Sequence, residues 1–266
     1  MKIAVAGCAG RMGLALVRKL LNTPGAKLSG GSERTGSKHE GQEVGSLVQA
    51  STPGILITTS PEALFLEADA VIDFSSPEYS KALAELAAKH KKIYVCGTTA
   101  IKDDGLEVFR KAAKKTPIVY SQNMSIGVNL LLEMVEKISS VLGVEECDIE
   151  VDEMHHHFKV DAPSGTALML GAAAARGRKV NLADVRTDYQ ASSLAARKQG
   201  AIGFSVRRGG DVIGDHTVTF ACMGERIEVS HKASNRDIFA AGAIRAALWA
   251  KDKPAGFYTM KDVLGI

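Results

Sequence analysis

The stretch GCAGRMG near the start of the chain places glycines at Gly7, Gly10 and Gly13. It follows a short apolar run, KIAVA (Lys2–Ala6), which is typical of a buried parallel strand. It precedes MGLALVRKLL (12–21), which we expect to be a helix. Glycine allows a tight turn and close approach to a pyrophosphate, and the N-terminus of a helix offers N–H groups to an anion. The order of strand, glycine turn and helix favours dinucleotide binding over an ordinary tight turn.

Two charged residues follow the second expected strand, KLSGGS (Lys27–Ser32). Glu33 stands where a Rossmann unit places the carboxylate that accepts the ribose hydroxyls of NAD. Arg34 beside it suits the 2′-phosphate of NADP, so we expect both NADH and NADPH to be accepted. The residues expected to bind the cofactor here are Gly7, Gly10, Arg11, Met12, Gly13, Glu33 and Arg34.

The rest of the first half continues to alternate strand and helix patterns. Further strands are expected at Ala70–Phe74, Lys92–Gly97 and Pro117–Ser121. Ser76 and Pro77 are a candidate cap and first residue of a helix with Ala82, Leu83, Leu86 and Ala87 on its apolar face. This rhythm predicts an α/β fold with a Rossmann-type, doubly wound parallel sheet. The residues Gly97, Thr98 and Thr99 lie at the carboxyl end of a strand, the sheet edge where ligands bind, although an ordinary turn remains the alternative.

The second half has a different pattern. A helix is expected with Val128, Leu131, Leu132, Val135 and Ile138 on one face. Alternating strands follow around Ile149, Ile202, Val218 and Ile227, with turns at Gly209–Gly210 and Gly224. They predict a smaller α+β domain with a mostly antiparallel sheet. Ser234 and Asp237 are typical of a capped start to the last helix, and 176–200 is the least regular segment.

Composition excludes several classes of protein. The 266 residues suffice for one large domain or two modest ones, and the net charge of +3 includes no long basic run, so we expect no nucleic-acid partner. We also expect no membrane partner, because no apolar run approaches the ~20 residues of a membrane span. The N-terminus lacks the pattern of a signal peptide. The cysteines, Cys8, Cys96, Cys147 and Cys222, form no C-x-x-C pair, so we expect reduced thiols in a cytoplasmic protein.

The stretch DEMHHHFKVDAPSGTAL (152–168) carries the most chemistry. Three consecutive histidines, His155, His156 and His157, point alternately to opposite faces of an extended segment and cannot converge on one ion, so we expect no metal. A solvated polar loop is the second interpretation. We favour a third, an anion pocket with a proton donor, because the following APSGT begins a helix and Lys159 adds a positive charge.

With these motifs, the chain resembles the 4-hydroxy-tetrahydrodipicolinate reductase (dihydrodipicolinate reductase) family of lysine and diaminopimelate biosynthesis. The resemblance covers the whole chain and is most specific in a motif similar to E-x-H-H-x-x-K-x-D-A-P-S-G-T-A, which begins at Glu153. Other similar stretches are AGCAGRMG, SER, VIDFS, GTT, the N-x-S-x-GVN of 123–129, the R-x-GD-x-x-G-x-H of 208–216, the GE-x-I-E-x-x-HKA of 224–233 and DVL. Met124 departs from the family, which often has phenylalanine there, and 176–200 fits poorly.

The resemblance implies two domains and a mechanism. Residues 1–126 and 236–266 would bind the dinucleotide, and 127–235 would bind the substrate and form a homotetramer. His155 would be the acid, His156 would line the substrate site, and Lys159 would anchor a carboxylate. Ser164, Gly165 and Thr166 would hold that carboxylate, while Thr99 would reach the substrate on domain closure. Gly97, Thr98, Thr99 and Met124 would contact the nicotinamide.

The implied reaction is hydride transfer from NADH or NADPH to a conjugated cyclic imine dicarboxylate, which yields tetrahydrodipicolinate without a metal. Two other functions remain open at this stage. One is another amino-acid-pathway NAD(P) dehydrogenase of the same fold, and the other is a non-catalytic nucleotide-sensing protein. The sequence leaves undecided the cofactor preference, whether the substrate loses water in the site, and the effect of Met124.

Overall fold

The structure is a computed structural model that describes residues 1–188 and 196–266, in two compact units. Unit 1 comprises Met1–Ile126 and Arg236–Ile266, and unit 2 comprises Gly127–Asn235. Within the described ranges, no helix combines the length and apolar character needed to cross a bilayer.

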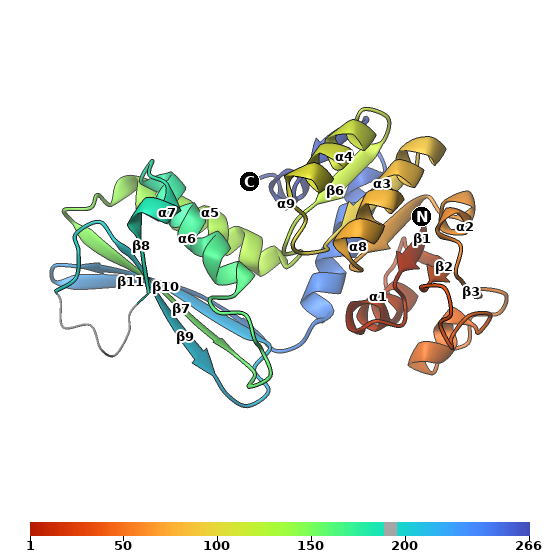
Figure 1. Cartoon of the computed structure of the whole chain (residues 1–266), viewed down its shortest axis with the longest axis horizontal. Helices are drawn as coiled ribbons and strands as arrows, with labels where there is room; N and C mark the ends of the chain where they lie inside the picture. Colours follow the sequence, from red (N-terminus) through yellow and green to blue (C-terminus); the bar gives the residue numbers. More distant parts are fainter. Residues whose placement is uncertain (189–195) are drawn as a thin grey trace. The chain divides into compact units, whose positions relative to one another are not determined.

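Unit 1 contains a parallel sheet of seven strands in the order β12-β6-β5-β4-β1-β2-β3 (Figure 1). The strands are β1 (Lys2–Ala6), β2 (Lys27–Ser32), β3 (Ile57–Thr58), β4 (Ala70–Asp73), β5 (Ile93–Cys96), β6 (Pro117–Tyr120) and β12 (Gly256–Tyr258). The helices are α1 (Arg11–Leu21), η1 (Val44–Val48), α2 (Pro61–Glu67), α3 (Pro77–His90), α4 (Asp103–Ala113), α8 (Asp237–Ala250) and α9 (Met260–Leu264). The strand order reverses beside β1, which is the usual ligand-binding point of such a sheet.

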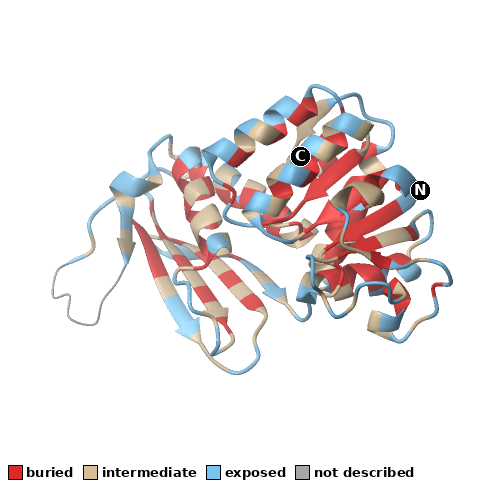
Figure 2. Ribbon diagram, turned by 45° about the vertical axis from the view of Figure 1, so that its right-hand side comes forward, coloured by how far each residue is buried: buried red, intermediate tan, exposed pale blue. Residues whose placement is uncertain are grey.

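Both faces of this sheet are covered, because successive side chains of a strand point to opposite faces. Ile3 and Val5 of β1 pack with α1, η1, α8 and α9. Ala4 and Ala6 pack on the other face with α2, α3 and α4. Burial on both faces explains the nearly continuous apolar strands, which are red in Figure 2. The predicted doubly wound parallel sheet is confirmed.

Unit 2 contains a five-stranded sheet in the order β11-β10-β7-β9-β8, with helices against one face (Figure 1). Its elements are α5 (Ile126–Val141), β7 (Cys147–His155), α6 (Gly165–Gly177), α7 (Leu182–Val185), β8 (Arg186–Asp188), β9 (Ile202–Arg208), β10 (Gly214–Cys222) and β11 (Glu225–Ala233). Ile149, Val151 and Phe220 form the core with α5 and α6. The sheet is mixed, because β7 and β8 each pair in parallel with β9, whereas β10 pairs antiparallel with both β7 and β11.

The expectation of a mostly antiparallel sheet is therefore wrong for half of the strand pairs. Alternation of apolar residues reveals which face of a strand is buried but not the direction in which the strand runs. The segment 209–213 is likewise no hairpin turn, because β7 lies between β9 and β10. This segment crosses the end of β7, where Gly209 N–H donates to the His155 carbonyl. Gly224 does lie in the tight turn between β10 and β11.

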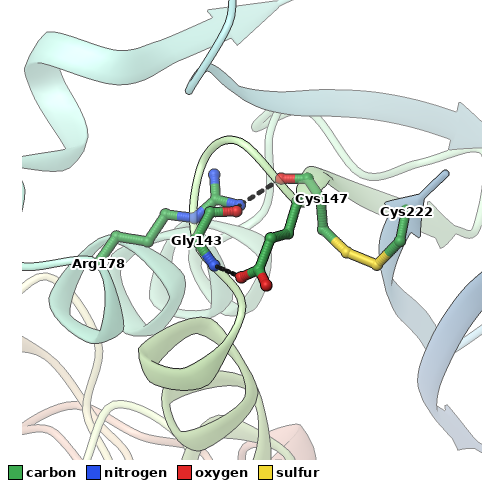
Figure 3. Close-up of a disulfide and its surroundings, with 5 residues drawn as sticks. Gly143, Cys147, Arg178 and Cys222 are labelled. Atoms are coloured by element: carbon green, nitrogen blue, oxygen red, sulfur yellow. Dashed lines mark hydrogen bonds between the residues drawn. A yellow bond between two sulfur atoms is a disulfide. The ribbon is translucent and has the colours of Figure 1, made fainter.

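Cys147 and Cys222 form a disulfide, contrary to the expectation of four reduced thiols (Figure 3). The two residues are directly opposite each other where β7 pairs with β10, with their Cα atoms 4.1 Å apart. This pairing could not be inferred from the spacing of the cysteines, because 75 positions separate the two residues. Cys8 and Cys96 are free and buried, as expected of thiols in the core.

Several local predictions also need correction. The last long helix begins at Asp237 with Arg236 at the N-cap position, so Ser234 does not cap it. Ser76 precedes Pro77 as predicted but makes no capping hydrogen bond. Ala82, which was predicted on the apolar face of the same helix, is exposed, whereas Leu83 and Ala87 are buried as predicted. The segment 176–200 contains the end of α6, α7 and β8, and its residues 189–195 lie outside the described residues.

We predict that Phe220→Ala destabilises the protein by about 3–5 kcal/mol, because a fully buried ring in the core of unit 2 is replaced by a cavity. Urea unfolding followed by circular dichroism measures the change. The matched control is Met223→Ala in the adjoining turn, where the side chain is 96% exposed. The control should change stability by less than about 0.5 kcal/mol. Equal effects of the two substitutions would contradict the packing described.

Candidate active site

The glycine turn of unit 1 joins β1 to α1. Gly7 adopts a φ of 67°, a conformation that favours glycine. Gly10 stands at the N-cap position of α1, and Arg11 and Met12 form its first turn. A Cβ at Gly13 would stand 2.6 Å from the Cα of Cys8, so only glycine allows α1 to pack this closely on the turn. The turn thus has the close backbone approach that a pyrophosphate site requires.

A cavity of about 500 Å³ lies beside this turn. It is lined by Gly7, Glu33, Arg34, Thr35, Thr59, Pro61, Ser75, Ser76 and Tyr79. The Glu33 carboxylate accepts a hydrogen bond of 2.8 Å from the N–H of Ala9, so it reaches back to the glycine turn. The predicted cluster of Gly7, Glu33 and Arg34 is therefore brought together in space. Thr59 and Tyr79 could not be predicted from the glycine motif, because they follow other strands of the sheet, β3 and β4.

The GTT segment follows β5 and divides into an inner and an outer part. Thr98 is buried, and its hydroxyl lies 3.3 Å from the carboxylate of Asp73. Thr99 is exposed at the same sheet edge. Gly97 packs so closely on Phe74 that a side chain would collide with its ring. Of the two threonines, only Thr99 has a side chain available to a ligand.

Asp73 is a fully buried carboxylate that sequence reasoning did not single out. Its oxygens accept hydrogen bonds from the hydroxyls of Ser80 and Tyr94, at 2.5 and 2.6 Å, and from the N–H of Ser75 at 2.8 Å. Burial and the negative charge of Asp73 raise the pKa of Tyr94, so that phenol stays protonated as a donor. An acidic residue in an otherwise apolar strand was the available signal.

Met124 does not line this cavity. Its side chain is fully buried in the core of unit 1 with Ala240 and Ala243 of α8. Its main-chain carbonyl occupies the space that a side chain at Gly242 would need. The expected contact of Met124 with a nicotinamide stays a prediction, and it has no support from the side-chain position.

A second cluster of polar side chains lies at the carboxyl end of β7 in unit 2. Glu153 is 1% exposed, and its Oε2 is hydrogen-bonded to Nδ1 of His155. Its Oε1 accepts from the N–H of Ser164 and from both terminal nitrogens of Arg208, each at 3.1 Å. Burial alone would raise the pKa of Glu153, but the hydrogen bonds and charges of His155 and Arg208 outweigh burial and lower it. The carboxylate thus stays ionised and orients the imidazole.

The start of α6 adjoins this cluster. Ser164 caps the helix by accepting from the N–H of Ala167 at 3.2 Å, and its hydroxyl lies 3.0 Å from Nε2 of His216. Ser164 is 2% exposed, so its hydroxyl serves the helix and His216. Gly165 is exposed with open space where a side chain would stand. The N-terminus of α6 can therefore receive an anion through its main chain rather than through Ser164.

The histidines and Lys159 face different surroundings. His155 is buried beside Glu153, whereas His157 is exposed and its Nδ1 is 2.9 Å from the Gly210 carbonyl. The N–H of His156 donates to the Val212 carbonyl at 2.7 Å. Lys159 forms an ion pair with Asp161, with its Nζ at 2.7 and 2.8 Å from the two carboxylate oxygens. The segment after β7 is thus folded against 209–213 and presents a cation.

Glu153, His155 and His216 each offer a donor atom within 4.8 Å of the others, so their geometry suits a metal ion. The guanidinium of Arg208 already binds Glu153, however, and would repel a second cation. His155 also uses Nδ1 for Glu153. We therefore interpret this group as a carboxylate–histidine pair whose partner, His216, supports the helix cap.

Comparison with known proteins identifies both units. Residues 1–124 match the family model described as "Dihydrodipicolinate reductase, N-terminus", and 127–264 match "Dihydrodipicolinate reductase, C-terminus". The chain is 49% identical over 266 residues to the 4-hydroxy-tetrahydrodipicolinate reductase of Brucella abortus, covering 100% of this chain and 99% of that protein. It is also 49% identical to the enzyme of the same name from Agrobacterium fabrum, covering 100% of this chain and 97% of that protein.

Solved structures support the fold. A dipicolinate-bound dihydrodipicolinate reductase from Paenisporosarcina sp. TG-14 aligns with a TM-score of 0.78 at 21% identity, covering 97% of each chain. GenD2 of gentamicin A biosynthesis, in complex with NAD, aligns with a TM-score of 0.61 at 14% identity and covers 99% of this chain and 90% of that one.

We predict that His216 makes stability depend on pH. Burial, and then the charge of His155, lower its pKa from 6.5 to about 4. As the pH falls, the unfolded chain binds a proton at this histidine before the folded chain does. The contribution of His216 to the free energy of unfolding is therefore complete above about pH 6.5, and about 3 kcal/mol of it is lost as the pH falls to about 4. Urea unfolding of the parent and of His216→Gln between pH 7 and 4 measures this loss. The variant should show a shallower decline, and the exposed His157→Gln should follow the parent. A decline as steep in His216→Gln as in the parent would refute the assignment.

Proposed function

The chain belongs to the dihydrodipicolinate reductase family, and we propose that it reduces the conjugated cyclic imine dicarboxylate derived from 4-hydroxy-tetrahydrodipicolinate. The product is tetrahydrodipicolinate, in lysine and diaminopimelate biosynthesis. The observation that carries the proposal is the cluster at the end of β7, where His155 is oriented by Glu153 close to the start of α6. A proton donor and an anion-binding helix terminus in one unit suit a dicarboxylate that must be protonated as it is reduced.

Unit 1 is proposed to bind the nicotinamide dinucleotide. The cradle at Gly13, which a Cβ would fill, and the cavity beside Glu33 and Arg34 fit this group. When bound, the reduced nicotinamide supplies the hydride. Gly97 and Thr99 lie at the carboxyl edge of the same sheet, where the ring of such a cofactor binds. Asp73 fixes that edge through Thr98 and Ser75.

Unit 2 is proposed to bind the substrate. Lys159 and the main-chain N–H groups at Gly165 and Thr166 would receive one carboxylate, and His156 would line the site. Lys159 also offsets the negative charge that develops on the ring during hydride addition. His155 then donates a proton to the carbon next to the one that accepts the hydride. Glu153 holds the imidazole in the orientation that this donation requires.

The direct test is an absorbance assay at the nicotinamide band with freshly made substrate. A dehydrogenase for an amine-bearing substrate would instead reduce NAD⁺ or NADP⁺ with that substrate, and a sensor would bind the cofactor without turnover. Steady oxidation of NADH or NADPH that needs the imine dicarboxylate supports the proposal. Pyridine-2,6-dicarboxylate should compete, because it carries both carboxylates but does not readily accept a hydride.

We predict that His155→Gln and Lys159→Met fail in different ways. Loss of the acid should lower kcat by ~100- to 10,000-fold with a smaller change in KM. Loss of the lysine charge removes a contact of ~1.5–3 kcal/mol, so KM should rise and kcat should fall as well. Affinity for the cofactor should stay near that of the parent, because unit 1 contains its proposed site. Near-normal turnover by both variants at an unchanged Tm would overturn these roles.

We predict that NADH and NADPH are both accepted, because Glu33 and Arg34 line one cavity. Arg34→Gln should weaken the binding of NADPH far more than the binding of NADH, because only NADPH has a 2′-phosphate for the guanidinium to contact. Steady-state kinetics with each cofactor measure both effects. A preference of the parent above about a thousandfold, or ~4 kcal/mol, would show that one of these side chains does not contact the ribose.

We also predict a homotetramer. The helices α5 and α6 pack on the face of the unit 2 sheet that carries Val151 and Phe220. Within the described residues, no helix is part of a core on the opposite face, which leaves that face available to other copies. Light scattering should give about four times the 28.2 kDa of the chain. A mass near 28.2 kDa at micromolar concentration would contradict the prediction.

A further inference from the structure

Arg208, the last residue of β9, uses every nitrogen of its guanidinium. Both terminal nitrogens donate to Oε1 of Glu153 at 3.1 Å. Nε donates to the carbonyl of Lys159 at 3.2 Å, and Nη2 donates to that of Asp161 at 2.7 Å. Nη1 also donates to the carbonyl of Arg207 at 2.7 Å. The side chain is 20% exposed, so little of it is left to bind a ligand directly.

These bonds join two parts of the proposed site. Through Glu153, Arg208 contacts the carboxylate that orients His155. Through two main-chain carbonyls, it holds the segment on which Lys159 and Asp161 stand. The segment has no regular secondary structure, so its conformation depends on such contacts. One planar group therefore sets where both the proton donor and the carboxylate-binding cation lie.

We propose that Arg208 is a positioning residue for the reaction, which fixes Lys159 relative to the Glu153–His155 pair. The inference rests on the proposed function and deepens it, because it assigns a role to a residue that neither binds the substrate carboxylate nor donates the proton. It depends on the shape of the guanidinium as well as its charge. A lysine carries the same charge, but its single ammonium cannot reach a carboxylate and two carbonyls on different sides at once.

The alternative is that Arg208 only neutralises the buried charge of Glu153. A lysine would then replace it with little loss, and any remaining loss would reflect stability alone. Double-mutant cycles separate the two roles, because residues that act through one another show non-additive effects.

The experiment measures kcat and KM for Arg208→Lys in three backgrounds: the parent, Lys159→Met and His155→Gln. In the parent, we expect kcat/KM to fall about 10- to 100-fold, with kcat lower and KM higher. In the Lys159→Met and His155→Gln backgrounds, Arg208→Lys should lower kcat/KM by a smaller factor, about threefold to tenfold, because one of the two positioned groups has already been removed. Equal factors in all three backgrounds, or parent-like kinetics of Arg208→Lys, would overturn the inference.

A second measurement needs no turnover. Hydrogen–deuterium exchange of peptides spanning 155–163 should be faster in Arg208→Lys than in the parent. The matched control is Arg207→Lys, since Arg207 is the exposed neighbour on the same strand and should leave exchange and kinetics unchanged. Unchanged exchange in Arg208→Lys would also refute the inference. If the parent fails to reduce the imine dicarboxylate while exchange responds as expected, the proposed reaction fails and the positioning role stands.

Discussion

The site in unit 2 depends on the hydrogen bonds that pair the buried carboxylate of Glu153 with its donors. Removing an ionised carboxylate from water costs several kcal/mol unless its oxygens are paired. Here four donors meet it, from His155, from the N–H of Ser164 and from two nitrogens of Arg208. These donors belong to β7, the start of α6 and the end of β9. Because each satisfies the same buried charge, the strand end, the helix terminus and the imidazole are fixed together, and displacement of one leaves the charge undercompensated.

Asp73 shows a similar arrangement in unit 1, although none of its hydrogen-bond donors among the described residues is a cation. Its donors are the hydroxyls of Ser80, Tyr94 and Thr98, the thiol of Cys96 and the N–H of Ser75, and of these Ser75 and Thr98 belong to the loops that follow β4 and β5. In both units, then, a buried acid lies at or near the carboxyl end of a strand that has a parallel neighbour, and the loops beyond carry the proposed binding residues. A strand end is rigid, whereas the loops after it are not held by the sheet ladder. A carboxylate with several acceptor positions ties such loops to the rigid part.

The fold of unit 1 was largely predictable, because strands buried on both faces give apolar runs. A glycine turn between a strand and a helix is, in addition, typical of a dinucleotide-binding fold. The short strands β3, β8 and β12 were not predictable, since two or three residues carry no periodicity. In unit 2 the pattern revealed the buried face but not strand direction. The proposed site residues His155 and Lys159 were inferred from their motif, whereas the proposed role of Arg208 could not be inferred from the sequence. Its partners are about fifty positions away, and only the pairing of β7 with β9 brings them near.

The ion pair of Lys159 and Asp161 connects this architecture to selectivity. Asp161 is paired with the ammonium group of Lys159, and this contact lowers the pKa of Asp161. On the proposed assignment, a substrate carboxylate that binds Lys159 replaces the carboxylate of Asp161, so this exchange alone yields little net free energy. The gain must come from groups that Asp161 does not satisfy, such as the main-chain N–H groups at the start of α6 and a second anionic group on the ligand. Since Arg208 fixes the main chain of Asp161, that residue stays beside Lys159 as a competitor. On the proposed assignment, the pocket therefore favours a ligand with two carboxylates over a ligand with one.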